Sequence, residues 1–113
     1  MKDIVNNEAK LIPVPNSKGI EFLLLEDIIR FEADRNYTKI YCKNETKHLA
    51  SKNIKHFEAL LDPKLFFRVH KSHIIHIKHL KSVDNDGLIK MTDNSIVPLA
   101  KRVRKDFLDF FKQ

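Results

Sequence analysis

The chain of 113 residues contains two glycines, one cysteine and no tryptophan. Gly19 and Gly87 stand far apart, so the sequence lacks the glycine-rich loop with which nucleotide-binding enzymes cradle phosphates. The single Cys42 excludes an internal disulfide and a cysteine framework for a metal, which fits a reducing compartment. No apolar run is long enough for a signal segment or a membrane span. We therefore expect a cytoplasmic protein with no membrane contact and no cofactor.

Apolar residues are nonetheless frequent enough to form a folded core. They make up 42% of the chain, and 113 residues provide room for one domain. Residues 1–9 are mostly polar, and we expect them to form a linker or a disordered arm. Residues 10–113 are expected to form the domain itself.

The net charge of +6 is distributed unevenly along the chain. Residues 1–63 contain ten Lys or Arg and ten Asp or Glu, and residues 106–113 contain one and two. Residues 64–105 contain ten and three, a net charge of +7, so the whole excess lies there. Such a concentration favours binding of a polyanion, whatever its sequence. A lysine-rich solvated surface is the alternative at this point.

Short apolar stretches rich in β-branched and aromatic residues predict a mainly β fold with antiparallel sheets. From Ser51 the apolar spacing becomes helical, and we expect its hydroxyl to cap a helix that ends before Pro63. A second short helix is predicted over residues 101–111, with an apolar face against a sheet. The expected strands are 10–15, 20–25, 30–33, 37–43, 46–50, 66–70, 73–77, 81–83, 88–91 and 95–99.

Four histidines recur at a constant spacing of three, and imidazole is a common metal ligand. Their neighbours predict an extended chain, where a spacing of three sends successive side chains to opposite faces. No Asp, Glu or Cys lies between Asp62 and Asp84 to complete a site. We therefore expect no metal site, although stoichiometric zinc or iron would support a metal-dependent enzyme. The four are His70, His73, His76 and His79.

Groups that could perform covalent or acid–base catalysis are few. Ser72, between His70 and His73, is the one candidate nucleophile, and no glycine-rich oxyanion loop accompanies it. Glu32 and Asp34 share a strand face, but the alternating charges around them are typical of a solvated surface. We expect no enzymatic activity.

Polar and basic residues cluster at three strand or loop ends, Arg35–Thr38, Arg68–Ser72 and Lys101–Arg102. Each cluster contains a side chain that can donate to a phosphate and one that can reach a base edge. Each is also compatible with an ordinary surface loop. The case for nucleic-acid binding depends on whether the three lie along one edge of the domain.

The motifs that contain these clusters resemble the LytTR family, the DNA-binding output domain of many bacterial response regulators. The first is Ile29-Arg-Phe-Glu-Ala33 followed by Asn36-Tyr37, the second is Phe66-Phe-Arg-Val-His-Lys-Ser-His-Ile-Ile-His76, and the third is Val97-Pro-Leu-Ala-Lys-Arg102. The resemblance extends from about Lys10 to the C-terminus. The chain departs from the family pattern at His76, where Asn is usual, and at Ala100-Lys101, where Ser-Arg is common.

The resemblance implies elongated antiparallel β-sheets with small helices. It also implies that loops, rather than a recognition helix, enter successive major grooves on one side of double-stranded DNA. Carried over position by position, it implies base contacts by Asn36, Thr38, Lys71 and Lys101, and phosphate contacts by Arg68, His70, Ser72 and Arg102.

The function that follows is sequence-specific binding of double-stranded DNA in bacterial transcription regulation. The resemblance implies the output domain of a two-component phosphorelay response regulator, with an upstream receiver or sensor domain in the full-length protein. Repeated half-sites on the DNA would then be occupied by two copies, as a homodimer on DNA. The alternative is an RNA- or anion-binding β module without sequence preference.

Overall fold

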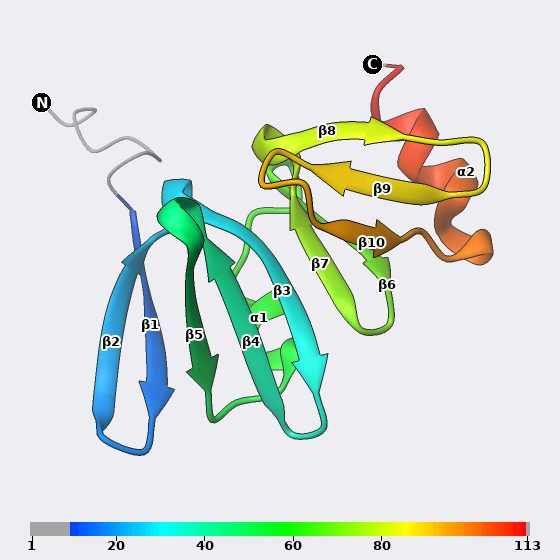
Figure 1. Ribbon diagram of the computed structural model, residues 1–113. Coiled ribbons are helices and arrows are strands. Elements are labelled where there is room, and N and C mark those ends of the chain that lie inside the picture. Colours follow the sequence, from blue (N-terminus) through cyan, green and yellow to red (C-terminus); the bar gives the residue numbers. More distant parts are fainter. Residues whose placement is uncertain (1–9, 113) are drawn as a thin grey trace, which may run out of the picture.

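The computed structural model describes residues 10–112, and within this range the chain forms three antiparallel sheets and two α-helices (Figure 1). The predicted mainly β fold with antiparallel sheets and small helices is thus confirmed. The described chain measures 41 × 39 × 25 Å, so it is extended in two directions and thin in the third. The arm predicted for residues 1–9 lies outside the described residues.

The strands follow one another along the chain with short turns, so nearly every pairing is local. The two-stranded sheet comprises β1 (Leu11–Asn16) and β2 (Gly19–Leu24). The five-stranded sheet has the order β5 (Thr46–Ala50), β4 (Tyr37–Cys42), β3 (Ile28–Asp34), β7 (His73–His76) and β6 (Phe66–His70). The three-stranded sheet has the order β10 (Ile96–Pro98), β9 (Leu88–Met91) and β8 (Leu80–Val83).

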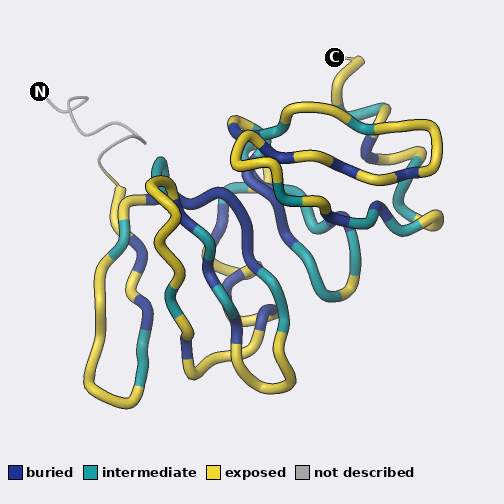
Figure 2. The backbone as a smooth tube through the Cα atoms, viewed as in Figure 1, coloured by how far each residue is buried: buried dark blue, intermediate teal, exposed yellow. Residues whose placement is uncertain are grey.

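The five-stranded sheet lies between two hydrophobic cores, because strands β3 and β7 are apolar on both faces. Adjacent residues Ile74 and Ile75 point to opposite sides of the sheet and are both buried. Ile74 belongs to the core that includes β1, β4 and α1, whereas Ile75 belongs to the core that includes β9, β10 and α2. Figure 2 shows the resulting buried stretch along β3 and β7. The sheet therefore holds both halves of the domain in place.

The two helices close these cores. Helix α1 (Ile54–Glu58) buries Ile54 and Phe57, and α2 (Lys101–Phe110) buries Phe107 against the ring of Phe67. The predicted cap at Ser51 is wrong, because Asn53 is the N-cap and its side chain accepts from the backbone N–H of His56 at 2.9 Å. No helix among the described residues is long and apolar enough to cross a membrane.

The histidine series divides into two pairs instead of scattering over both faces. The rings of His76 and His79 lie 4.9 Å apart because a 3-10 turn (Ile77–His79) ends the strand and brings His79 back. His76 Nδ1 lies 2.8 Å from the carbonyl of Ile28, and His79 Nε2 lies 2.9 Å from that of Glu26. Both rings are buried, and each contacts a backbone oxygen. Residues 10–112 contain no group of three or more His, Cys, Asp or Glu that could hold a metal.

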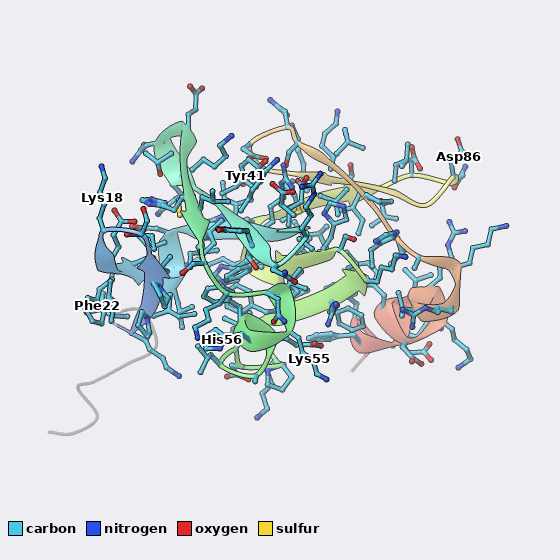
Figure 3. The ribbon with its side chains drawn as sticks, turned by 90° about the horizontal axis from the view of Figure 1, so that it is seen from below. Lys18, Phe22, Tyr41, Lys55, His56 and Asp86 are labelled. Atoms are coloured by element: carbon cyan, nitrogen blue, oxygen red, sulfur yellow. The ribbon has the colours of Figure 1, made fainter. Side chains whose placement is uncertain are left out.

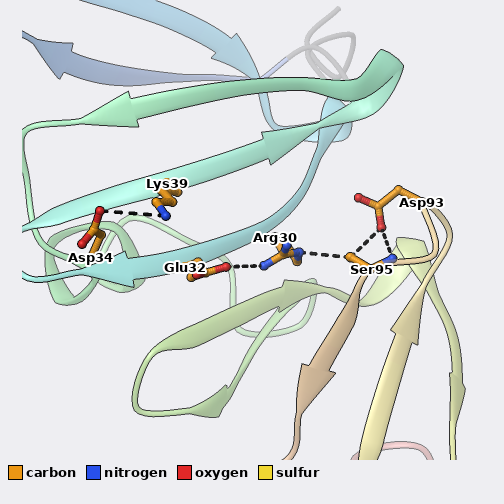
Figure 4. Close-up of polar contacts among 6 residues, drawn as sticks. All are labelled: Arg30, Glu32, Asp34, Lys39, Asp93 and Ser95. Atoms are coloured by element: carbon orange, nitrogen blue, oxygen red, sulfur yellow. Dashed lines mark hydrogen bonds and ion pairs between the residues drawn. The ribbon is translucent and has the colours of Figure 1, made fainter.

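A buried arginine joins the five-stranded sheet to the three-stranded sheet (Figure 4). Arg30 Nε donates to Ser95 Oγ at 3.1 Å, and its Nη1 contacts Glu32 at 2.8 Å. The guanidinium also lies 3.9 Å from the ring centroid of Tyr41. Burial raises the pKa of Glu32, but the hydrogen bond and charge of Arg30 outweigh it and leave that pKa lowered.

Candidate nucleic-acid interface

The structure brings the three predicted clusters together along one border of the molecule. The β3–β4 turn, the β6–β7 turn and the start of α2 follow one another along the lower right of Figure 1. Backbone hydrogen bonds connect them, since Ala33 N–H donates to Ser72 O at 2.8 Å and Ala100 N–H donates to Val69 O at 2.8 Å. The three clusters therefore lie along one edge of the domain, as the hypothesis of nucleic-acid binding requires.

The β3–β4 turn presents two exposed residues. Asp34 pairs with Tyr37, so Arg35 and Asn36 form a two-residue loop. Arg35 has φ = 60°, a conformation that favours glycine in such hairpins, and this costs the chain about 1 kcal/mol. Asn36 is exposed as a base contact requires. Arg35 was not among the predicted contacts. Its position beside Asn36, in the Arg35–Thr38 cluster, was the sequence signal by which it could have been included.

Thr38 does not fit the predicted base-contacting role. It is fully buried on β4, and its Oγ1 donates to the backbone carbonyl of Lys52 at 2.8 Å. A side chain at this position of an alternating strand faces the core, which the motif alone did not show. Thr38 therefore fixes the end of β5 beside β4 and offers no group to a ligand.

The β6–β7 turn is a second two-residue loop, formed by Lys71 and Ser72 between the paired residues His70 and His73. Lys71 is exposed at its tip. His70 Nδ1 accepts from the backbone N–H of Ser72 at 3.1 Å. A neutral His70 consequently has its proton on Nε2, which leaves a donor suited to a phosphate oxygen. The Ser72 hydroxyl, by contrast, donates no hydrogen bond to His70 among the described residues, so His70 is not placed to activate it as a nucleophile.

The side chain of Arg68 contacts the backbone of this turn. Its Nη1 contacts Glu58 Oε1 at 2.7 Å, and its Nη2 donates to the carbonyl of Lys71. The Nε atom is buried and, among the described residues, has no partner. Two of the arginine's donors are thus already occupied within the protein, where they connect β6 to Glu58 and to the carbonyl of Lys71.

Lys101 and Arg102 are the first two residues of α2 and are both exposed. The N-terminus of a helix carries a partial positive charge, which adds to that of the two side chains. A surface hollow of ≈ 360 Å³ lies between this helix and the β6–β7 turn. It is lined by Glu58, Arg68, His70, Lys71, Arg102 and Val103, so four predicted site residues surround one depression.

Two other potentially reactive side chains, those of Cys42 and His73, are uncharged at neutral pH. Cys42 is buried, and desolvation raises the pKa of its thiol to about 11, so the thiol is protonated at neutral pH. Burial also lowers the pKa of His73, so this imidazole is neutral and contributes no charge to the border. The chemistry of the border is therefore that of hydrogen-bond donors and fixed cations.

A β domain that presents exposed cations and amides from successive loops along one border has the charge and geometry expected of a nucleic-acid-binding domain. Residues 18–112 match the family model described as the LytTr DNA-binding domain. The chain belongs to this LytTR family, whose members bind DNA in transcriptional regulators.

Similar proteins agree with this assignment. The chain is 35% identical over 95 residues to the heme-containing CO-sensing transcriptional regulator RcoM 2 of Paraburkholderia xenovorans, covering 80% of this chain and 35% of the relative. It is 26% identical over 111 residues to the transcriptional regulatory protein LytR of Staphylococcus aureus, covering 95% and 45%. The chain thus spans less than half the length of these relatives.

The fold also matches a solved structure. The LytTr DNA-binding domain of a putative methyl-accepting/DNA response regulator from Bacillus cereus superimposes with a TM-score of 0.76 at 20% identity. The match covers 89% of this chain and 95% of that domain. At this identity the likeness establishes the fold.

Proposed function

We propose that the domain binds a specific sequence of double-stranded DNA by inserting the three loops of this border into successive grooves on one side of the duplex. The observation that carries the proposal is the pair of backbone hydrogen bonds that holds the β3–β4 turn, the β6–β7 turn and the start of α2 in a fixed order. Loops fixed in this way lose little conformational freedom on binding.

The contacts divide by chemistry. Asn36, Lys71 and Lys101 are exposed at the loop tips, where amide and ammonium groups can reach acceptors and donors on base edges. His70 and Ser72 are half-buried and Arg102 is exposed beside Lys101, and all three are assigned to phosphates. Arg68 acts through the β6–β7 turn, and Thr38 is removed from the set. The family pattern commonly has arginine where this chain has Lys101. Because a lysine ammonium is a point charge, it selects among bases less strongly than the planar guanidinium of arginine does.

The wider role we propose is that of the output domain of a response regulator, with a receiver or sensor domain joined to its N-terminal side. Support comes from the LytR relatives, which are about twice as long as the segment that this chain matches. Two copies would then occupy repeated half-sites, since tethering raises the effective concentration of the second copy.

Binding-site selection from random duplexes, followed by fluorescence anisotropy titration on the selected site, tests the function. Lys71→Ala and Lys101→Ala should each cost about 1–3 kcal/mol of binding free energy and relax base preference at one position. Lys43→Ala is a matched control, because Lys43 lies at the opposite end of β4, where it pairs with Asp27 at 3.4 Å.

Two outcomes would contradict the proposal. Unchanged affinity and base preference in both variants would remove these loops from the interface. Equal competition by single-stranded or A-form RNA would favour the non-specific RNA- or anion-binding module, since a deep and narrow RNA groove does not admit loops shaped for B-form DNA.

A further inference from the structure

A fourth loop lies on the same border and belongs to none of the three family motifs. The β1–β2 turn, residues 16–19, lies at the end of the molecule where β5 finishes and β4 begins (Figure 1). Ser51, just after β5, donates to the carbonyl of Pro15 from its backbone N–H at 2.9 Å and from its hydroxyl at 3.2 Å. The hairpin is therefore attached to the end of β5.

The same series of hydrogen bonds continues to the β3–β4 turn. The carbonyl of Lys52 accepts from Thr38 Oγ1, so the end of β5 is fixed beside the first residues of β4. This bond explains why Thr38 is buried yet belongs to a motif associated with DNA binding. The row of loops thus extends from α2 to the β1–β2 turn, and each loop is connected to the next by a hydrogen bond to a backbone carbonyl.

The fourth loop has the charge of a phosphate-binding surface. Lys18 and Lys52 are exposed, and neither forms an ion pair with any residue in the described range. Lys18 N–H donates to Asn16 Oδ1 at 2.8 Å, which orders the turn and leaves the ammonium free. In Figure 3, which faces this border, the Lys18 side chain extends away from the hairpin.

The acidic residues beside this loop do not cancel its charge. An open hollow of ≈ 670 Å³ separates the hairpin turn from β4 and β5, and its lining includes Lys18, Lys47, Tyr37 and Ser51. Glu21 is the single carboxylate among its lining residues and lies 3.2 Å from His48. Asp34, on the neighbouring turn, lies 3.9 Å from Lys39. A positive surface therefore continues beyond the base-contacting loops.

The overall size of the domain is compatible with a duplex that passes all four loops. The domain is 41 Å long, whereas one turn of B-form DNA rises about 34 Å. A duplex that runs along the longest dimension of the domain would therefore extend over about one helical turn. Phosphates of a duplex that follows the border past the β3–β4 turn would lie beside the next loop outward.

We propose that the β1–β2 turn and the end of β5 form a fourth DNA contact, in which Lys18 and Lys52 bind phosphates just outside the base-contacting segment. The inference rests on the proposed function, because it assumes that DNA follows this border. Lys18 and Lys52 contact phosphates and not bases. They therefore extend the footprint on the DNA and strengthen binding to all sequences.

The test measures binding of the selected duplex over a range of salt concentrations for Lys18→Ala, Lys52→Ala and the double variant. Each lysine that neutralises one phosphate should reduce the slope of log K against log salt by about 0.9. Base preference should stay that of the wild type. Both side chains are exposed, so unchanged circular dichroism and melting curves are expected to show that the variants fold.

A second arm uses the length of the DNA. Removing base pairs beyond the segment contacted by the β3–β4 turn should weaken the wild type and leave the double variant unaffected. A slope equal to that of the Lys43→Ala control, or a length dependence kept by the double variant, would overturn the fourth contact. The proposed function would fail separately, through unchanged binding by Lys71→Ala and Lys101→Ala.

Discussion

At the scale of single residues, His76 shows how desolvation controls protonation. Its side chain is 3% exposed, stacks on the ring of Phe66 at 4.3 Å and contacts the carbonyl of Ile28. Burial lowers the pKa of His76 to about 4, although the backbone hydrogen bond to Ile28 partly opposes the shift. His79 and Lys78 lower it further, whereas Glu26 raises it. The ring is therefore neutral in the folded protein at neutral pH.

We expect this histidine to make the protein less stable in mild acid. The unfolded chain binds a proton near pH 6.5 and the folded protein only near pH 4, so unfolding takes up a proton between these values. The free energy of unfolding should fall by up to about 3 kcal/mol as the pH is lowered across this window. Urea denaturation at pH 7.5, 6.0 and 5.0 measures the effect.

The variant His76→Asn carries the residue usual in the family, and its amide can donate to the Ile28 carbonyl without titrating. It should lose most of the pH dependence above pH 4.5. His56→Asn, which removes an imidazole from an exposed position, should retain the wild-type profile. A profile unchanged by His76→Asn would show that another group controls acid stability.

At the scale of elements, α1 shows that a capping residue is identified by its hydrogen bond and not by its type. Both Ser51 and Asn53 are good N-cap residues, and both precede the apolar spacing. In the structure Ser51 connects β5 to the β1–β2 hairpin, and Asn53 caps the helix. The helix therefore begins at Ile54, and it ends at Glu58, before Pro63 is reached.

Asn53→Ala should destabilise the protein by about 1 kcal/mol, since the His56 amide loses Asn53 Oδ1 as an acceptor and keeps only the Asn53 carbonyl at 3.1 Å. Urea denaturation measures this loss of stability, and amide exchange at His56 should accelerate in the same variant. Asn53→Asp keeps an acceptor at the cap and should stay close to wild type. If amide exchange at His56 accelerated in Ser51→Ala and stayed unchanged in Asn53→Ala, Ser51 and not Asn53 would be the N-cap.

At the scale of the whole molecule, the spacing of the loops proposed to contact DNA depends on how the two cores are joined. The five-stranded sheet provides apolar contacts to both cores, and Arg30 adds a polar connection to the three-stranded sheet. Ser95, which accepts from Arg30, in turn donates to Asp93 at 2.6 Å. This network fixes the three-stranded sheet, against which α2 packs, relative to β3.

Arg30→Met should destabilise the domain by about 1–3 kcal/mol, because Glu32 and Ser95 lose a partner in a mostly buried place. Amide exchange should increase most in β9 and β10, which the network holds. Arg102→Met removes an exposed arginine and should leave stability unchanged. Equal losses in the two variants would show that the connection contributes nothing beyond charge.

Much of the fold could be predicted from local patterns because its strand pairings are mostly between neighbours. The turns at Asp34–Tyr37 and His70–His73 separate strands whose own residues favour an extended chain. The exposure of Asn36, Lys71 and Lys101 could likewise be expected from motifs that place them in loops. Burial of Thr38 could have been expected from its alternation with Ile40 and Cys42 on β4, whereas its partner could not, since the Lys52 carbonyl lies 14 residues away on another element.

The sequence by itself determined the class of fold, the family and the stretch of the chain that carries the positive charge, because these depend on residue types and their order along the chain. The tertiary structure alone decided that Arg68 supports the β6–β7 turn, that His76 is desolvated, and that the β1–β2 hairpin is hydrogen-bonded to the end of β5. The reason is physical. Each of these properties arises from contacts between atoms distant in the chain, where burial and hydrogen bonding depend on three-dimensional packing.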